Sequence, residues 1–543
     1  MTPSPALRRT AQILRLGQRR FDVLVIGGGI TGAGIARDAA RRGLDVALVE
    51  RDDFASGTSS RSSRLVHGGV RYLEHGYLRL VFESCHERRV LLRIAPHLVR
   101  PLPFTWPVYA GARISLWKLQ AGLLLYDLLA LFRNVAPHHR LDAEGVADAE
   151  PLLARAGLRG GARYYDAATD DARLTLATLF DAAVAGATIV NHVEVAGLRL
   201  ADSRADGVNV NDRLGGRAFE ISASCVVNAT GPWTDGVRRM EDPLAAPALI
   251  GTKGVHIAVP AHRVGNRGAV TLLAGDGRVM FVLPGGSCTI MGTTDTPTSE
   301  SPEQVRATRA DIAYLLASAN RAFPAAMLTS DDVIAAWAGI RPLIAKGNAG
   351  NPSAASREHL VETGPQGVIT VTGGKLTTYR VIAADVVATV FRALGRRPPP
   401  DRTDELPLAG GDVRDLPAEI TAARAASGAD DIATRLVHAY GGAWHHVWAR
   451  THDDPSLGAR LIKGLPYVGA EVVHAVEAEL ACTLADVMVR RLHLAFEVRD
   501  HGLSVASRVA ALMAPLLGWT DRGIELALQD YGREVQRIFA IEP

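Results

Sequence analysis

The sequence contains few cysteines. Only four occur among 543 residues, Cys85, Cys225, Cys288 and Cys482, and no two of them form a Cys-x-x-Cys pair. This scarcity argues against a disulfide-stapled fold and against a cysteine zinc site, so we expect no metal. It is typical of a reducing cytoplasmic compartment, and we predict four free thiols.

An excess of one charge is also absent. The 60 Lys and Arg residues nearly balance 57 Asp and Glu residues, which leaves a net charge of +3. This balance gives no support to a nucleic-acid partner. Hydrophobic residues make up 48% of the chain, as is usual in a globular enzyme, and the length allows two or three domains.

The sequence lacks an uninterrupted apolar run that could span a bilayer. The longest candidate, residues 114–132, contains Lys118 and Asp127. A charged residue at mid-span costs about 2.5–3.5 kcal/mol, which argues against a spanning helix. Two alternatives stay open: a helix buried inside the protein, or a helix lying in the membrane interface between Arg113 and Arg133.

The first twenty residues contain five arginines and no acidic residue. They lack the long apolar core of a secretory signal, although an organellar transit peptide has a similar composition. We expect residues 1–20 to form a basic N-terminal extension that is disordered or touches anionic lipid.

The most informative segment is a glycine-rich turn between two apolar runs. Residues 21–26 have the apolar, β-branched character of a central parallel strand. Gly27, Gly29 and Gly32 follow in the pattern G-x-G-x-x-G, which suits a tight turn, close approach of a pyrophosphate and close helix packing. The following helix would point its amides at the phosphates, and Glu50, after the second strand, could bind ribose hydroxyls. This order predicts an ADP-binding Rossmann unit.

Strand and helix patterns then alternate along the chain. Strand-like runs at 188–210 and 223–228 and a strand-rich stretch at 250–295 indicate an antiparallel substrate domain interleaved with the Rossmann-type domain over residues 21–400. A proline-rich break ends this region, and the pattern over residues 401–543 is helical. The predicted fold class is therefore α/β + α, with an all-helical C-terminal domain.

Two further glycine turns follow strands, one at Gly231 and one at Gly373-Gly374. The second opens a helix whose N-terminal amides could stabilise negative charge on a flavin ring. NAD enzymes need no such second turn so far along the chain, so we predict FAD as the cofactor. The hydroxyl-rich and basic loop at 58–64 is either a solvated turn or a contact with phosphate or flavin.

Seven motifs occur in order along the chain: 58–60 (TSS), 67–75 (HGGVRYLEH), 228–233 (NATGPW), 253–256 (KGVH), 292–295 (GTTD), 339–343 (GIRPL) and 373–380 (GGKLTTYR). Together they resemble the aerobic, respiratory, FAD-dependent glycerol-3-phosphate dehydrogenase family. The resemblance implies a D-amino-acid oxidase-like fold for the FAD-binding and substrate domains.

The resemblance also implies a reaction and its partners. Glycerol 3-phosphate would be oxidised to dihydroxyacetone phosphate, and electrons would pass through FAD to ubiquinone or menaquinone. The protein would then be cytoplasmic, peripherally bound to lipid at the inner membrane and able to form a homodimer. The nearest alternative is a soluble glycerol-3-phosphate oxidase that uses oxygen and produces hydrogen peroxide. An amine or amino-acid oxidase would not explain a phosphate clamp. The complete set of glycine turns argues against a flavin-fold binding protein without catalysis.

The matched motifs imply the site residues. Arg71, Tyr72, Arg341 and Arg357 would bind the substrate, because guanidinium groups bind phosphate bidentately. His256 and Lys375 are the candidates for the catalytic base, with Arg341 as a further catalytic group, and the base stays unassigned. The implied cofactor-binding residues are Gly27, Gly29, Gly32, Glu50, Thr58, Ser59, Ser60, His67, Gly68, Gly231, Gly374, Lys375, Leu376 and Thr377.

Overall fold

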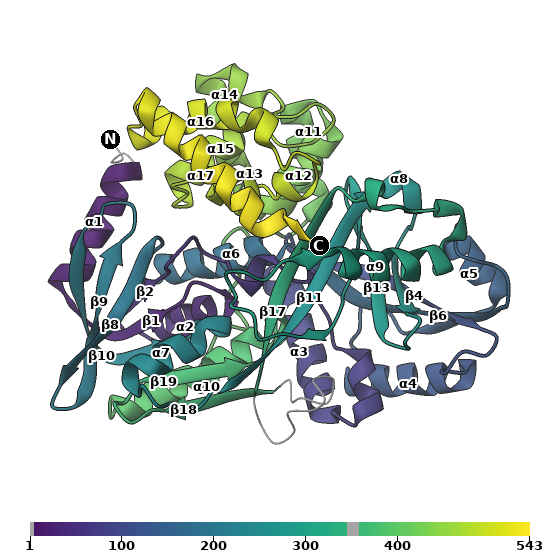
Figure 1. The fold of residues 1–543 in the computed structure, drawn as a ribbon, viewed down its shortest axis with the longest axis horizontal. Coiled ribbons are helices and arrows are strands. Elements are labelled where there is room, and N and C mark those ends of the chain that lie inside the picture. Colours follow the sequence, from purple (N-terminus) through teal and green to yellow (C-terminus); the bar gives the residue numbers. More distant parts are fainter. Residues whose placement is uncertain (1–4, 345–357) are drawn as a thin grey trace.

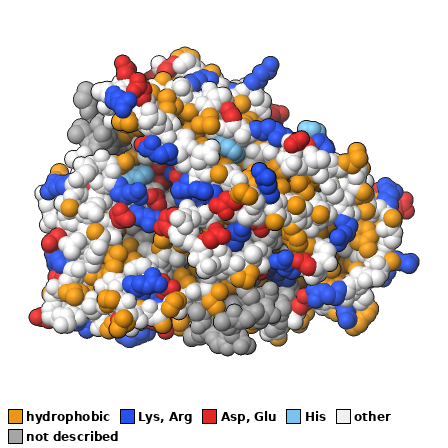
Figure 2. Space-filling model, viewed as in Figure 1, with side chains coloured by type: hydrophobic (Ala, Val, Ile, Leu, Met, Phe, Trp, Pro, Cys, Tyr) orange, Lys and Arg blue, Asp and Glu red, His pale blue; other side chains and the backbone are white. Residues whose placement is uncertain are grey.

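A computed structural model of the protein describes residues 5–344 and 358–543. It contains a nucleotide-binding domain, a substrate domain beside it and a helical C-terminal domain that lies across both (Figure 1). Acidic and basic side chains are mixed on the surface shown in Figure 2, in keeping with the small net charge.

The nucleotide-binding domain is built on a sheet with the strand order β18-β19-β10-β1-β2-β7. Its central strand β1 (Arg20–Ile26) pairs in parallel with β2 (Val46–Val49) and β10 (Ala218–Asn228). Strand β2 is fully buried, and most of β1 and the C-terminal part of β10 are buried too, because helices cover the sheet. The remaining elements are β7 (Thr188–Val190), β8 (Val193–Ala201), β9 (Arg204–Asp212), β18 (His359–Thr363), β19 (Ile369–Gly373), α2 (Ile30–Arg41), α6 (Asp171–Val184), α7 (Thr234–Glu241) and α10 (Tyr379–Ala393).

The substrate domain is a largely antiparallel sheet with the order β15-β11-β14-β13-β12-β4-β6-β3, and β17 pairs with β11. Its strands come from two separate stretches of chain, so the predicted interleaving with the nucleotide-binding domain is confirmed. They are β3 (Leu65–Val66), β4 (Val99–Tyr109), β5 (His139–Leu141), β6 (Leu158–Thr169), β11 (Leu249–Pro260), β12 (Ala269–Leu273), β13 (Val279–Gly285), β14 (Cys288–Gly292), β15 (Thr296–Pro297), β16 (Ala307–Thr308) and β17 (Ala335–Ile344). The helices of this region are α3 (Leu78–Ile94), α4 (Leu116–Leu129), α5 (Ala143–Ala149), α8 (Ala261–Val264) and α9 (Arg309–Ala322).

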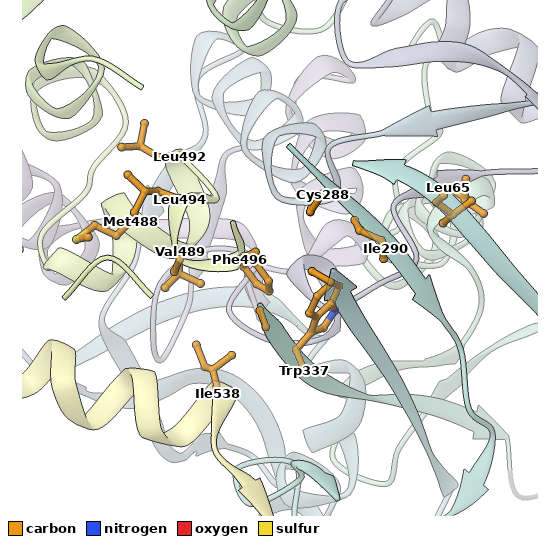
Figure 3. Close-up of a cluster of buried hydrophobic side chains, with 14 of the residues drawn as sticks. Leu65, Cys288, Ile290, Trp337, Met488, Val489, Leu492, Leu494, Phe496 and Ile538 are labelled. Carbon is orange, nitrogen blue, oxygen red and sulfur yellow. The ribbon is translucent and has the colours of Figure 1, made fainter. Parts of the chain in front are cut away.

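The C-terminal domain is mainly helical, as predicted, but it ends in a short strand. Strand β20 (Ile541–Glu542) pairs in parallel with β16 of the substrate domain. The two domains also share an apolar core, in which Phe496 meets Trp337 edge to face with ring centroids 5.1 Å apart (Figure 3). The helices are α11 (Leu416–Ser427), α12 (Asp430–Tyr440), α13 (Trp444–Trp448), α14 (Arg450–Asp453), α15 (Gly469–Ala478), α16 (Leu503–Leu517) and α17 (Asp521–Phe539).

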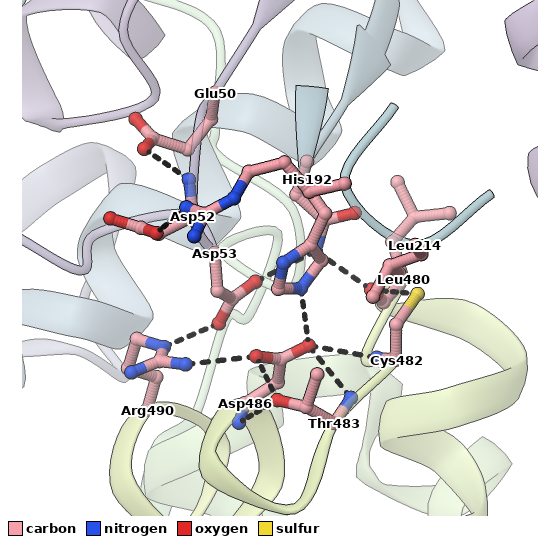
Figure 4. Close-up of polar contacts among 12 residues, drawn as sticks. Glu50, Asp52, Asp53, His192, Leu214, Leu480, Cys482, Thr483, Asp486 and Arg490 are labelled. Atoms are coloured by element: carbon pink, nitrogen blue, oxygen red, sulfur yellow. Dashed lines mark hydrogen bonds and ion pairs between the residues drawn. The ribbon is translucent and has the colours of Figure 1, made fainter. Parts of the chain in front are cut away.

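A buried network of charges joins the C-terminal domain to the nucleotide-binding domain (Figure 4). Asp53 is fully buried, and one of its carboxylate oxygens lies 2.6 Å from both Arg490 and Arg491. Asp486 binds Arg490 at 2.8 Å and the Nε2 atom of His192 at 2.9 Å. Each carboxylate therefore has cationic partners, as buried charges require.

The N-terminal region differs from the expected disordered extension. Residues Pro5–Gln18 form helix α1, whose Ile13 and Leu16 are buried. Arg9 forms an ion pair of 2.7 Å with Asp212, which is the last residue of β9. The partners of this helix lie some two hundred residues away in the chain, so local composition could not predict it.

Helix α4 lies in the apolar stretch at residues 114–132, which was predicted to be either a helix buried inside the protein or a helix in the membrane interface. Leu119, Leu123 and Tyr126 are buried against the substrate domain, whereas the opposite face is exposed. The helix is therefore half-buried rather than enclosed. In the described part of the chain, no helix is long and apolar enough to cross a membrane.

Candidate active site

The turn between β1 and α2 has the geometry that the glycine pattern predicts. Gly27 has φ +111°, and a Cβ atom there would lie 2.7 Å from the carbonyl oxygen of Ala229. A Cβ atom at Gly32 would lie 2.0 Å from the carbonyl oxygen of Gly27, so only glycine permits this approach of helix to strand.

Glu50 supports this turn from the end of β2. Its carboxylate accepts hydrogen bonds from the backbone N–H groups of Gly28 at 2.7 Å and Asp52 at 2.9 Å. Burial raises the pKa of Glu50, although these two hydrogen bonds oppose the shift. The residue predicted as a ribose ligand thus lines the cleft and also holds the backbone around it.

A cleft of about 600 Å³ runs from this turn to the substrate domain. Ser59 stands at its dinucleotide end, where its hydroxyl accepts a hydrogen bond of 3.0 Å from the Ile30 N–H at the start of α2. Ser60, Gly32 and Gly68 are buried behind the wall and do not line the cleft. The predicted residues that line it are Gly27, Gly29, Glu50, Thr58, Ser59, His67, Arg71, Tyr72, Gly231, His256, Arg341, Gly374, Lys375, Leu376 and Thr377.

Two cations contact the ring of Tyr72 in the wall of the cleft. The Lys375 ammonium lies 3.9 Å and the Arg71 guanidinium carbon 5.2 Å from the ring centroid. Both contacts are cation–π interactions, which hold the side chains in place. Lys375 follows the turn at Gly373 and Gly374, both of which have positive φ.

Arg341 projects from β17 into the same cleft. One of its terminal nitrogens lies 2.9 Å from Asp295, and the other lies 3.0 Å from the hydroxyl of Thr293. These contacts orient a guanidinium whose side chain is 21% exposed. The structure thus brings Arg71, Arg341 and Lys375 into one cleft. Arg357 lies outside the described residues.

His256, on β11, forms a hydrogen-bonded pair with Ser63. Its Nε2 atom lies 2.8 Å from the Ser63 hydroxyl, and its ring stacks on Trp337. Burial, assisted by Arg341 and Arg64, lowers the pKa of His256 to about 3. Sequence reasoning did not identify Ser63 as a site residue, although its position in a hydroxyl-rich loop was a signal.

A second missed group closes the dinucleotide end of the cleft. Arg51 lies 5.1 Å from the ring centroid of Trp233 and binds Glu303 of the substrate domain at 3.1 Å. Glu303 also accepts a hydrogen bond from the Trp233 indole N–H. The three residues come from separate segments, and no local pattern links them.

Within the described residues, two groups outside the cleft have ligand atoms within 4.8 Å of one another, as a metal site would. The first is Asp53, His192 and Asp486, and the second is Asp170, Asp171 and His493. In the first group, Arg490 and Arg491 already bind Asp53. In the second, His493 lies 3.4 Å from Asp170, and Asp171 accepts a hydrogen bond of 2.6 Å from Ser62. We assign no metal to either group.

Comparisons with known proteins agree with this architecture. A family model described as FAD-dependent oxidoreductase matches residues 22–380. A model described as the C-terminal domain of alpha-glycerophosphate oxidase matches residues 401–524. The second match covers most of the mainly helical domain.

Among individual proteins, glycerol-3-phosphate dehydrogenase 2 of Mycobacterium tuberculosis is 39% identical over 538 residues, which cover 98% of this chain and 91% of the relative. The solved glycerol-3-phosphate dehydrogenase from Bacillus halodurans, complexed with FAD, has 32% identity and a TM-score of 0.82 over 98% of both chains. The L-alpha-glycerophosphate oxidase of Mycoplasma pneumoniae shares only the fold, with 17% identity and a TM-score of 0.54 over 72% of this chain and 99% of the oxidase. The chain therefore belongs to the glycerol-3-phosphate dehydrogenase family of FAD-dependent oxidoreductases.

Proposed function

We propose that the protein oxidises sn-glycerol 3-phosphate to dihydroxyacetone phosphate with FAD and passes the electrons to a membrane quinone. The observation that carries this proposal is the meeting of a dinucleotide turn with Arg71, Arg341 and Lys375 in one cleft. A phosphate monoester needs such cations, because each can make charge-assisted hydrogen bonds to phosphate oxygens.

The dinucleotide end of the cleft fits FAD. A Cβ atom at Gly29 would lie 3.2 Å from the Ser59 hydroxyl, so the glycine leaves room for a pyrophosphate above the start of α2. Gly27 and Glu50 would shape this part of the site, and Gly374 to Thr377 would face the flavin. When bound, FAD supplies the acceptor for the hydride that leaves C2 of the substrate.

The protein side chains would bind and orient the substrate. Arg341, held by Thr293 and Asp295, offers a planar fork to the phosphate, and Arg71 adds a second guanidinium. Lys375, beside Tyr72, would stand near the flavin and the reacting hydroxyl. These roles stay predictions until variants are measured.

The test is anaerobic addition of glycerol 3-phosphate to the purified holoenzyme while the flavin absorbance is followed. We expect bleaching that recovers quickly when a ubiquinone analogue is admitted. Rapid recovery with oxygen and formation of peroxide would instead identify an oxidase. A yellow protein that does not bleach would contradict the proposed substrate.

We also propose that helix α4 lies on the membrane surface, where a quinone is accessible. One stripe of α4 and the turn after it is apolar and exposed, with Trp117 at 69%, Leu124 at 55%, Leu128 at 54% and Leu131 at 53%. The spacing of seven and four residues puts Trp117, Leu124 and Leu128 on one face of the helix, and Leu131 follows in the turn. Lys118 lies beside Trp117 and could contact anionic headgroups. Figure 1 places α4 along the edge of the substrate domain that faces away from the C-terminal domain.

Flotation with anionic liposomes tests this surface. We expect the wild type to float and the double variant Leu124→Asp/Leu128→Asp to stay at the bottom of the gradient. The matched control is Val184→Asp/Leu244→Asp, which places the same charges at residues that are 78% and 92% exposed elsewhere. Equal flotation of both variants would contradict a role for α4. A homodimer remains a separate prediction, to be checked by analytical ultracentrifugation.

A further inference from the structure

The hydrogen-bonded pair of Ser63 and His256 has a fixed arrangement at the wall of the cleft. His256 is 3% exposed, whereas Ser63 is half-buried and lines the cleft. The imidazole is stacked on Trp337 with 5.6 Å between ring centroids and 13° between the planes. This packing holds the ring in one orientation, so a molecule in the cleft meets the pair mainly through the Ser63 hydroxyl.

The hydrogen bond within the pair has a definite direction. Among the described residues, the buried Nδ1 atom of His256 has no hydrogen-bond partner. Either tautomer leaves Nδ1 unpaired, but a buried N–H group without an acceptor is rarer in folded proteins than a buried acceptor without a donor. We assign the proton to Nε2, which donates to the Ser63 oxygen. The Ser63 hydroxyl then keeps its own hydrogen for an acceptor in the cleft.

The surroundings of His256 also make it a weak proton acceptor. Its pKa is lowered to about 3 by burial and by Arg341 and Arg64. An efficient general base has a pKa near the working pH. The imidazole is thus better suited to donate a hydrogen bond than to remove a proton from substrate.

The pair stands close to the proposed phosphate clamp. Gly254 precedes His256 by two residues on β11, so both residues face the same side of the sheet. A Cβ atom at Gly254 would lie 2.9 Å from a terminal nitrogen of Arg341. A substrate whose phosphate binds Arg341 would therefore place the oxygen on its C2 carbon against the wall of the cleft that contains Ser63.

We propose that Ser63 donates a hydrogen bond to the oxygen on the carbon that is oxidised, and that His256 is a positioning residue that fixes the direction of this bond. The inference rests on the proposed function and deepens it, because it names the group that recognises the secondary hydroxyl. The same bond suits the product, whose carbonyl oxygen is also an acceptor. The positioning role removes His256 from the candidates for the catalytic base.

Binding of two unreactive ligands to the oxidised holoenzyme tests the role of Ser63. Dihydroxyacetone phosphate has an oxygen at C2, whereas 3-hydroxypropyl phosphate has none. We expect Ser63→Ala to weaken the binding of dihydroxyacetone phosphate about tenfold, which is the upper range for one neutral hydrogen bond. The affinity for 3-hydroxypropyl phosphate should stay within about twofold of the wild-type value. Ser63→Thr, which keeps the hydroxyl, should restore the binding of dihydroxyacetone phosphate.

Equal changes for both ligands, or no change for either, would overturn the role of Ser63. Failure of both ligands to bind the wild type would instead contradict the proposed function, before any variant is compared. The flavin absorbance of each variant reports whether it folds and retains cofactor.

The role of His256 is tested with His256→Gln, since a glutamine amide can still donate to Ser63. We expect the rate constant of flavin reduction to fall by less than about tenfold. A fall of more than about a hundredfold, the effect of removing a general base, would overturn the positioning role.

Discussion

The nucleotide-binding domain meets its two neighbours in different ways. Toward the C-terminal domain, Asp53, Arg491 and Asp486 are fully buried and bind partners at short distances. Toward the substrate domain, the facing groups line an open cleft, and the side chains of Arg341 and Asp295 are 21% and 15% exposed. The first interface is suited to permanent attachment, whereas the second leaves charge accessible to an anionic ligand.

The largest effect on folding should come from Asp53→Ala. The substitution removes the carboxylate that binds both Arg490 and Arg491, so two buried cations lose a partner. We expect the free energy of unfolding to fall by about 3–5 kcal/mol, measured by urea titration. The control is Asp530→Ala on α17, whose partner Arg533 is exposed, and we expect a change within about 0.5 kcal/mol. Equal effects of both substitutions would remove the contrast between the two interfaces.

Arg341→Ala should act on catalysis rather than on folding. We expect kcat/KM for glycerol 3-phosphate to fall by an amount equivalent to about 2–5 kcal/mol, because the phosphate loses a charged partner. Stability should change little, since this side chain lies at an open cleft. Arg341→Lys, which keeps the charge but not the planar fork, should recover part of the activity. A nearly normal kcat/KM in the alanine variant would refute the phosphate clamp.

The smallest predicted effect distinguishes two histidines in the buried interface. Asp486 raises the pKa of His192, so its contribution to stability is present below about pH 6.5 and is lost as the pH rises through the raised pKa. Burial lowers the pKa of His493 to about 3, so its neutral form contributes above about pH 6.5 and that contribution is lost as the pH falls.

Unfolding of His192→Gln and His493→Gln over pH 4–8 checks these signs. We expect the two substitutions to change the slope of stability against pH in opposite directions, each by at most about 1.4 kcal/mol per pH unit. Slopes that change in the same direction would show that the two histidines do not differ in their charge state as described.

The sequence was most informative where a structural unit is continuous in the chain. Strand β1 and the glycine turn were located almost to the residue, because the strand and turn signals follow one another directly. The helix α1 was missed, since it depends on Leu16 packing in the core and on the Arg9–Asp212 ion pair. Ser63 was missed for the same reason, because its partner His256 is 193 residues away.

The order of strands in the nucleotide-binding sheet has a consequence for synthesis of the protein on the ribosome. Strand β1 emerges first and is soon followed by its neighbour β2. Its other neighbour, β10, follows only after β3 to β6 of the substrate domain, and the next strand, β19, only after β11 to β17 as well. At about 5–20 residues per second, the edge of β1 that later pairs with β10 therefore stays unpaired for roughly ten seconds or more. We expect this domain to need chaperone protection during translation, and FAD to bind only after residue 380 has left the exit tunnel.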